Sequence, residues 1–236
     1  MALAFESWTG TAGGNSASSS QVGNLPATIN AGDILVCIQS MEGGGTVSSV
    51  SDSTSDSWTV LDDTNAFTVS GGNASCSIKV ADGDEDGGTV TVTTSDARYW
   101  SIGVIRISGG SGTSSIGTAA TGNNVNPDCP TVTASWGSDD NLFIAYGGLH
   151  DDGETVSSYP SGYSNGNYQQ ANGTSTNNNA TAWAAVKAAT AATDNPGTAS
   201  VSSTATWVSN TLVLQPASTG ATAPVFVHHR RQLDIV

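Results

Sequence analysis

The sequence is poor in charged residues, in cations and in long apolar runs. Charged side chains make up 11% of the 236 residues and aromatic side chains 6%, whereas about a quarter of an average domain is charged. Disordered chains usually combine high charge with few regularly spaced apolar residues. Here the Val, Ile and Leu runs recur regularly, so we expect an ordered β protein with a hydroxyl-rich surface.

Cations are scarce. The chain has 6 Lys and Arg residues against 20 Asp and Glu residues, which gives a formal net charge of −14. Residues 1–227 hold four of these cations and nineteen of the acids, a balance of −15. Such a body repels the phosphates of nucleic acids and the surface of an anionic membrane. We therefore expect neither as a partner.

Targeting signals are also missing from the pattern. The first residues, Met1–Glu6, show no basic start followed by a long apolar stretch, and no run is long enough to cross a bilayer. Cys37 and Cys76 lie in apolar strand patterns, and alanines stand at the matching positions of the second half. We expect these two cysteines to be buried free thiols, in a protein that folds in a reducing cytoplasm; Cys129 makes the number of cysteines odd.

The second half of the chain repeats the first. Four blocks recur in the same order at offsets of 107 to 109 residues. The paired blocks are residues 33–38 and 140–145, 46–50 and 155–159, 77–81 and 185–189, and 100–104 and 207–211. Chance rarely preserves both order and spacing, so the pattern indicates a duplicated module. A duplicated half is first of all a scaffold.

Strand-like stretches recur about every ten residues between Gly, Asn, Asp and Ser turns, which is typical of a sandwich or barrel. The expected strands are residues 4–8, 27–29, 33–40, 47–52, 57–62, 75–81, 89–94, 99–108, 131–135, 141–149, 156–159, 163–169, 181–189, 199–203 and 206–215. The Ala-rich segment 182–192 has high helix propensity, but its counterpart at 75–81 alternates like a strand, so we predict a strand there too.

These patterns predict an all-β protein, a jelly-roll-like β-sandwich built from two homologous halves. Two tandem immunoglobulin-like sandwiches are the alternative. We expect residues 1–108 to form the first half and residues 116–216 the second, packed together as one body. Residues 109–115, rich in Gly and Ser, are expected to be a flexible linker. Residues 217–236 are expected to be a spacer and an anchoring tail.

The tail is apolar, then basic, then apolar again, unlike anything before it. Its residues of interest are Val225, Phe226, Val227, His228, His229, Arg230, Arg231, Leu233, Ile235 and Val236. Exposed apolar side chains of this kind are a liability unless they are buried on a partner, so we predict a docking peptide. Metal binding by the two histidines is not expected, because adjacent side chains of an extended chain point to opposite sides.

One acidic turn resembles the start of a calcium loop. Asp82, Asp84 and Asp86 have the D-x-D-x-D-G spacing, but the twelfth position is Thr93, where an EF-hand has a glutamate. The segment also joins two predicted strands and not two helices. A solvated acidic hairpin turn is therefore the favoured interpretation, with a calcium site as the alternative.

No catalytic site and no cofactor are predicted. His150 is the only histidine within the repeated body, and most of the few glutamates lie in expected loops. Paired carboxylates of a glycosidase cannot be recognised from sequence, so a secreted or surface enzyme acting on polysaccharide stays open as a rival.

Aromatic residues offer a second rival function. Trp58, Tyr159, Tyr163 and Tyr168 fall in or beside loop-rich stretches and are the candidates for stacking on sugar rings. Trp100 and Trp207 are repeat partners, which favours a role in the core.

The order of the blocks carries a resemblance. Gly32-Asp33-Ile34-Leu35-Val36 opens the module, and residues 46–50, 52–61, 77–81 and 89–93 follow it before a closing strand with an aromatic start. Over residues 32–216 this order resembles β-sandwich virion structural proteins of tailed bacteriophages. The resemblance implies a capsid decoration (cement) protein on the phage head or a fibre, without catalytic residues.

A protein of this kind would bind the major capsid protein or another virion protein and form a trimer or dimer. It would be assembled in the host cytoplasm and stand on the particle surface. The alternative function is a glycan- or receptor-binding adhesin module of the tail or fibre.

Overall fold

The structure is a computed structural model that describes residues 2–13, 17–65, 72–150, 154–172 and 179–218. These residues form strands, turns and loops and no helix, so the prediction of an all-β fold is confirmed. Among them there is consequently no helix long and apolar enough to span a bilayer. The first half contains β1 (Ala4–Ala12), β2 (Ser18–Asn24), β3 (Ile34–Glu42), β4 (Val47–Asp52), β5 (Thr59–Asn65), β6 (Gly72–Val80), β7 (Thr89–Arg98) and β8 (Trp100–Ser108).

The first half is a jelly roll of two antiparallel sheets. One sheet has the order β1-β8-β3-β6-β5 and the other the order β2-β7-β4. The start of β5 touches β4 through the bridge between Ser51 and Ser57, and β5 then pairs with β6. Eight strands that alternate between two sheets in this order define the jelly-roll sandwich.

The second half has the same topology. Its strands are β9 (Gly110–Ile116), β10 (Ala120–Asn124), β11 (Asp128–Cys129), β12 (Val132–Thr133), β13 (Asp139–His150), β14 (Val156–Ser158), β15 (Ser164–Asn172), β16 (Asn179–Ala191), β17 (Thr193–Asp194), β18 (Gly197–Thr198), β19 (Ser200–Val201) and β20 (Ala205–Pro216). The large sheet has the order β10-β20-β13-β16-β15, with β9 also paired to β20. Short ladders β11–β18, β12–β17 and β14–β19 form the second layer.

The matching strand orders confirm that the two halves are homologous, and they correct the alignment within one block. Ile34 pairs with Val80 and Ile107, and Leu142 pairs with Ala188 and Leu214, so Ile34 corresponds to Leu142 at an offset of 108. Aligning the aspartates at 33 and 140 shifted this strand by one residue. Such a slip moves every side chain to the opposite face of the sheet.

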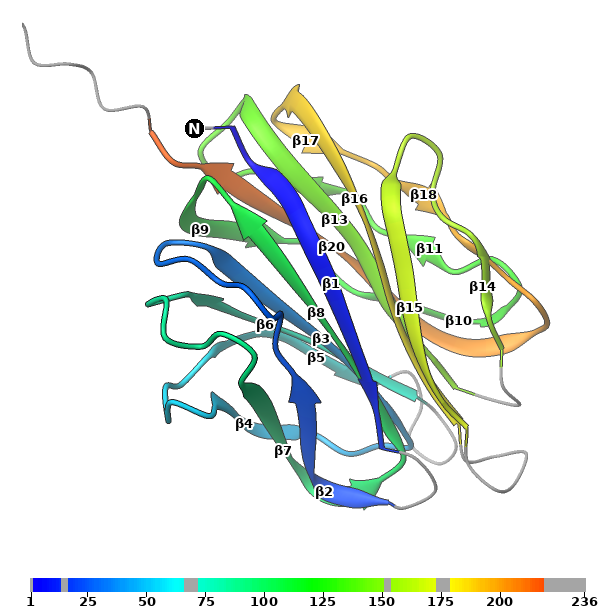
Figure 1. The fold of residues 1–236 in the computed structure, drawn as a ribbon. Helices are drawn as coiled ribbons and strands as arrows, with labels where there is room; N and C mark the ends of the chain where they lie inside the picture. The colour runs from blue at the N-terminus through cyan, green and yellow to red at the C-terminus, as the bar shows by residue number, and fades with distance from the viewer. Residues whose placement is uncertain (1, 14–16, 66–71, 151–153, 173–178, 219–236) are drawn as a thin grey trace, which may run out of the picture.

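The two large sheets pack face to face, and each smaller layer covers the outer face of its own large sheet (Figure 1). Strands of the large sheets are therefore buried on both faces, as the nearly unbroken burial of β3, β13, β16 and β20 shows. The expected alternation of buried and exposed residues survives in β7, whose sheet has one face on the core. The Ala-rich segment 182–192 forms most of β16, so the strand prediction is confirmed.

The core between the halves is built from equivalent positions of both. The first half contributes Leu3, Ile34, Val36, Ile38, Cys76, Ile78, Ile105 and Ile107, and the second Leu142, Ile144, Tyr146, Ala182, Ala184, Val186, Leu212 and Leu214. Strand β3 packs on β13 and β16, while β13 packs on β3 and β6, the counterparts of those strands. The contact thus has the two-fold character of a symmetric dimer interface, within one chain.

Polar bonds fix the two halves in register across this core. The carboxylate of Asp62 accepts hydrogen bonds from Tyr146 Oη at 2.7 Å and from Asn210 Nδ2 at 3.0 Å, both on the oxygen Oδ2. The backbone N–H of Ala182 donates to Ser101 Oγ at 2.8 Å. Because each of these bonds needs one relative position of the sheets, they add specificity to an otherwise non-directional apolar contact.

The expected linker at residues 109–115 is instead a strand. Nearly all of it belongs to β9, which pairs with the end of β20. Only Gly109 separates β8 from β9; it has a φ of 79°, and a Cβ there would collide with the carbonyl oxygen of Ala2. Serine and threonine are acceptable strand residues when a partner strand is available, so the composition alone was a poor guide.

Of the remaining predictions, one strand was wrong and those on the cysteines and tryptophans were confirmed. Residues 27–29 form no strand and lead directly into a turn that Asn30 and Asp33 close with two hydrogen bonds, while β2 was not predicted. Cys37 and Cys76 are free and buried, as predicted, and Cys129 is free and buried as well; burial raises the pKa of the Cys37 thiol to about 12. Trp100 and Trp207 are both buried, which confirms their core role.

The shared core makes the two halves one unfolding unit. Ile144→Ala, at a fully buried position between the large sheets, should lower the free energy of unfolding by about 2–5 kcal/mol and move a single thermal transition for the whole chain. Differential scanning calorimetry measures both effects. Val22→Ala, at an exposed position on β2, is the control and should change stability by less than about 0.5 kcal/mol. Two separate transitions would contradict the shared core.

Candidate functional site

The most charged feature of the described residues is a buried ion cluster around Lys79. Lys79 is the penultimate residue of β6, and its side chain is only 6% exposed. The acids that surround it come from two stretches of the chain, one formed by the end of β4 and its loop to β5, and the other by the loop between β6 and β7. Stretches that far apart in the sequence meet here because β6 pairs with β5 while β7 pairs with β4.

The ammonium group touches three carboxylates directly. Lys79 Nζ lies 2.7 Å from Asp52, 2.6 Å from Asp56 and 2.9 Å from Glu85, and a fourth acid, Asp82, lies 4.0 Å away. Asp52 and Glu85 have fully buried side chains, whereas those of Asp56 and Asp82 are 45% and 72% exposed. Four acids against one cation leave the cluster with a formal charge of −3.

Hydrogen bonds hold the buried acids in their ionised form. Burial by itself would raise the pKa of Asp52, but bonds from Lys79, Thr54 and the Trp58 indole outweigh it and lower the pKa to about 2. Burial likewise opposes ionisation of Glu85, and Lys79 with two backbone N–H groups lowers its pKa. The same carboxylates raise the pKa of Lys79 against the effect of burial.

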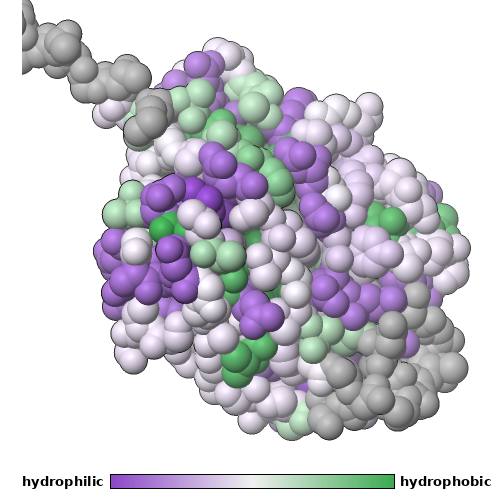
Figure 2. Space-filling view, in the orientation of Figure 1, coloured by the Kyte–Doolittle hydropathy of each residue, from purple (hydrophilic) through white to green (hydrophobic). Residues whose placement is uncertain are grey.

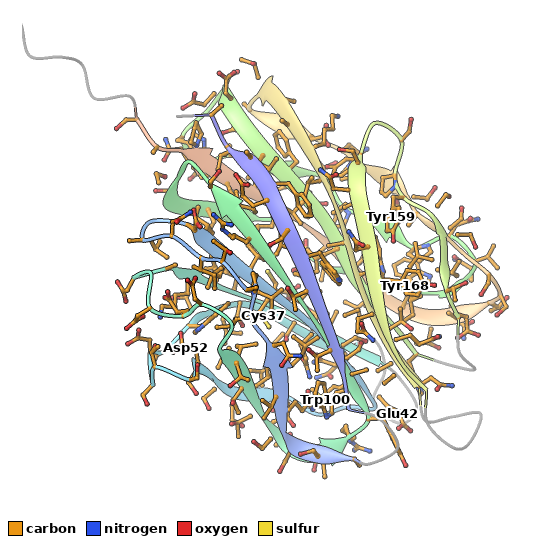
Figure 3. The ribbon with its side chains drawn as sticks, viewed as in Figure 1. Cys37, Glu42, Asp52, Trp100, Tyr159 and Tyr168 are labelled. Atoms are coloured by element: carbon orange, nitrogen blue, oxygen red, sulfur yellow. The ribbon has the colours of Figure 1, made fainter. Side chains whose placement is uncertain are left out.

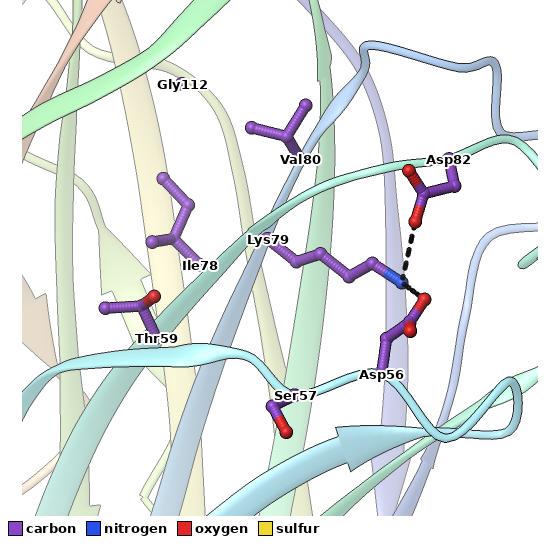
Figure 4. Close-up of a pocket in the computed structure, with 8 residues that line it drawn as sticks. All are labelled: Asp56, Ser57, Thr59, Ile78, Lys79, Val80, Asp82 and Gly112. Atoms are coloured by element: carbon purple, nitrogen blue, oxygen red, sulfur yellow. Dashed lines mark hydrogen bonds and ion pairs between the residues drawn. The ribbon is translucent and has the colours of Figure 1, made fainter.

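An open pocket of about 370 Å³ lies against the exposed side of this cluster (Figure 4). We call it the acidic pocket; it is lined by Asp56, Ser57, Thr59, Ile78, Lys79, Val80, Asp82 and Gly112. Hydrophilic side chains gather over the neighbouring loop between β6 and β7, at the left edge of Figure 2. The pocket therefore combines an apolar floor with an acidic rim.

Carboxylate oxygens of Asp52, Asp56 and Glu85 lie within 4.8 Å of one another, a spacing that could hold a metal ion. In this structure the Lys79 ammonium lies within hydrogen-bond distance of all three carboxylates and offsets one of their three charges. The arrangement is that of a cation cage in which the cation belongs to the chain.

The residues of the alternative calcium site do not converge. Asp82, Asp84 and Asp86 are all exposed, and Asp86 turns away to accept a hydrogen bond from the backbone N–H of Ile29. The residue of this loop that does point inward is Glu85, which the calcium pattern had not included. The signal that could have found the cluster is Lys79 itself, the first cation along the chain.

The second half keeps a reduced version of the cluster. Lys187, the counterpart of Lys79, pairs with Asp194 at 2.5 Å and lies 5.8 Å from the ring centroid of Tyr163. Tyr163 Oη donates to the same carboxylate at 2.7 Å. With one acid for one cation, this site carries no excess charge.

The aromatic candidates divide into two groups. Trp58 is 6% exposed and donates to Asp52, so its ring is part of the first-half core and offers no face for a sugar. Tyr159 and Tyr168 lie near each other beside and on the edge strand β15 (Figure 3), and Tyr168 is 40% exposed. Tyr163 is half-buried and held by Asp194. Of these four aromatic side chains, only Tyr168 is exposed.

Two features bear on catalysis. His150 is buried at the end of β13, with Nδ1 at 3.3 Å from the carbonyl oxygen of Asn179. Residues 162–166 read Gly-Tyr-Ser-Asn-Gly, the G-x-S-x-G spacing of a nucleophile elbow, which sequence reasoning had not used. The structure places Ser164 at a bulge of an edge strand, with its hydroxyl 3.5 Å from the Val186 carbonyl, and not at a strand-to-helix turn.

The docking tail predicted at residues 225–236 lies outside the described residues. The chain leaves the described body after Ser218. Just before that point, the backbone N–H of Ala217 donates to the Gly109 carbonyl at 2.7 Å.

Comparison with known proteins adds no identity. No protein-family model matches this chain, and neither a curated protein nor a solved structure matches it.

Removing the ammonium group should be costly. Lys79→Met leaves two fully buried carboxylates without a cation, so the free energy of unfolding should fall by about 3–5 kcal/mol in urea titrations. Lys187→Met is the matched control, because its single ion pair is partly exposed and should contribute about 1 kcal/mol or less. Equal losses for the two variants would mean that the cluster is not specially stabilising.

The cluster should also make the protein acid-sensitive. The folded-state pKa of Asp52 lies below its ordinary value of 3.8, so its stabilisation is complete above about pH 4 and is lost as the pH falls toward 2. The loss should amount to about 2 kcal/mol. Urea titrations between pH 2 and 5 should show a shallower decline for Asp52→Asn than for the unmodified chain. Parallel curves would contradict this assignment.

Proposed function

We propose that this chain is a virion structural protein, a capsid decoration protein on the outer surface of a tailed-phage head. The observation that carries the proposal is the fused pair of jelly rolls, which share one core and so form a single rigid body. The jelly roll is used in viral capsid proteins and in lectins, so the fold supports this class of function by analogy. The order of the sequence blocks, which resembles phage virion proteins, supports it independently.

Charge distribution also suits a particle exterior. Each of the four cations in the described part of the chain forms an ion pair with an acid of the same body; these cations are Lys79, Arg98, Arg106 and Lys187. The surplus acids therefore set the surface potential, which keeps such bodies soluble and apart from one another. The remaining two cations, Arg230 and Arg231, follow the body in the segment with the apolar residues.

In this proposal the segment 225–236 attaches the body to the shell or to a neighbouring copy. Burial of four or five of its apolar side chains contributes about 1.5–3 kcal/mol each. Many copies on one lattice then add weak contacts across neighbouring shell subunits, and mass action stabilises the assembled state.

A glycan-binding adhesin is the second candidate. It is favoured by one observation, the exposed ring of Tyr168 beside Tyr159 at an open sheet edge. Aromatic faces of this kind stack on sugar rings, but two tyrosines on one strand edge make only a small platform.

The test uses purified particles of the virus that encodes the chain. Mass spectrometry should find the protein at a fixed stoichiometry to the major shell protein. Full-length protein should rebind to particles stripped of it, and deletion of residues 221–236 should weaken binding by about 100-fold or more, because the apolar anchor is lost. Tyr168→Ala is the control and should bind as the full chain does.

Other outcomes separate the candidates. A truncated protein that binds particles as well as the full chain would rule out the anchoring role. Binding to a glycan array that depends on Tyr168, together with absence of the protein from particles, would favour the adhesin.

A further inference from the structure

The acidic pocket lies close to the point where the chain leaves the described body. Gly112 of β9 lines the pocket, and Gly109, three residues earlier, bonds to Ala217. Three residues of extended chain span about 10 Å. The twelve residues from 219 to 230 can span about 40 Å when extended, so Arg230 can reach the pocket with chain to spare.

The pocket carries an excess of negative charge, which the two arginines of this segment can offset. The cluster keeps a formal charge of −3 after Lys79 is counted, and its two exposed members, Asp56 and Asp82, form the rim. No hydrogen bond engages Asp56 Oδ1 within the described residues. A planar guanidinium group with several donors fits such a pair of open carboxylates better than a second ammonium would.

The pocket floor also lacks a cover. Val80 lines it and is 46% exposed, the highest value among the exposed large apolar side chains of the described residues. Apolar residues flank the arginines of the segment on both sides, with Val225–Val227 before them and Leu233, Ile235 and Val236 after them. The floor and rim of the pocket thus match the two kinds of side chain in the segment.

We propose that residues 225–236 dock on the acidic pocket of their own chain. Arg230 and Arg231 then face Asp56 and Asp82, and a neighbouring apolar side chain covers Val80. A short tether favours this intramolecular site over a second copy, because it keeps the effective concentration of the segment near millimolar. This docking describes the free protein: a shell or neighbouring copy that binds the segment, as proposed above, has to displace it from the pocket, and the docking itself does not depend on any particle.

The rate of trypsin cleavage at Arg230 and Arg231 reports this docking in the full chain. The four other Lys and Arg residues lie within β6, β7, β8 and β16, so cleavage at Arg230 and Arg231 should come first. Intact-mass measurement follows the loss of residues 232–236, with a synthetic peptide of residues 219–236 as the undocked reference. The protein should be cleaved about five- to tenfold more slowly than the peptide, because cleavage requires the open form.

Variants locate the contact. Asp82→Asn, at an exposed position that cannot unfold the body, should speed cleavage about two- to threefold, and the double variant Asp56→Asn, Asp82→Asn should approach the peptide rate. Salt of about 0.5 M should do the same for the unmodified protein by screening. Asp140→Asn is the matched control on β13, where Asp140 lines a second, more apolar pocket; it should cleave as the unmodified protein does.

Each other result overturns the proposal. Cleavage of the unmodified protein at the peptide rate would show an undocked segment. Acceleration by Asp140→Asn but not by Asp82→Asn would place the segment over the second pocket. Protection that grows with protein concentration would assign the contact to a neighbouring copy. Because the assay contains no particle, none of these results decides the proposed function.

Discussion

The structure depends on one apolar contact, the face-to-face packing of the two large sheets. Each jelly roll turns one face of its large sheet to its own small layer and the other face to its twin. Neither half could keep that second face in water, because it consists mainly of Ile, Leu, Val and Ala side chains. The second half is therefore needed to cover the apolar face of the first. The hydrogen bonds from Tyr146 and Asn210 to Asp62 fix the register of the two sheets in this contact.

Much of the fold could be predicted because the sequence contains the same module twice. The repeat identified β16 as a strand against its helix propensity, and it placed Trp100 and Trp207 in equivalent core positions. Strands buried on both faces, such as β3 and β13, are the ones that apolar runs reveal best. Because nearly every residue in these runs is apolar, the runs do not show which residues face the twin sheet and which face the small layer. One block was therefore aligned with an error of one residue.

What could not be predicted comes from contacts between distant residues. Strands β2 and β9 consist mostly of Ser, Gly, Gln and Thr, and they form because β7 and β20 offer backbone partners. The ion cluster could not be predicted for a similar reason. Its acids come from two stretches about thirty residues apart, residues 52–56 and 82–85, and the regular Asp spacing of 82–86 indicated exposed aspartates and not the buried Glu85.

The position of β20 has a mechanical consequence. This strand is hydrogen-bonded on one side to β13 and on the other to β9 and β10, so it lies inside its sheet and not at an edge. A pull on the residues that follow Ala217 would load a twelve-residue strand along its length and shear two ladders at once. Both ladders of β20 share a tension applied there, so no single strand can separate from the sheet before the others bear load.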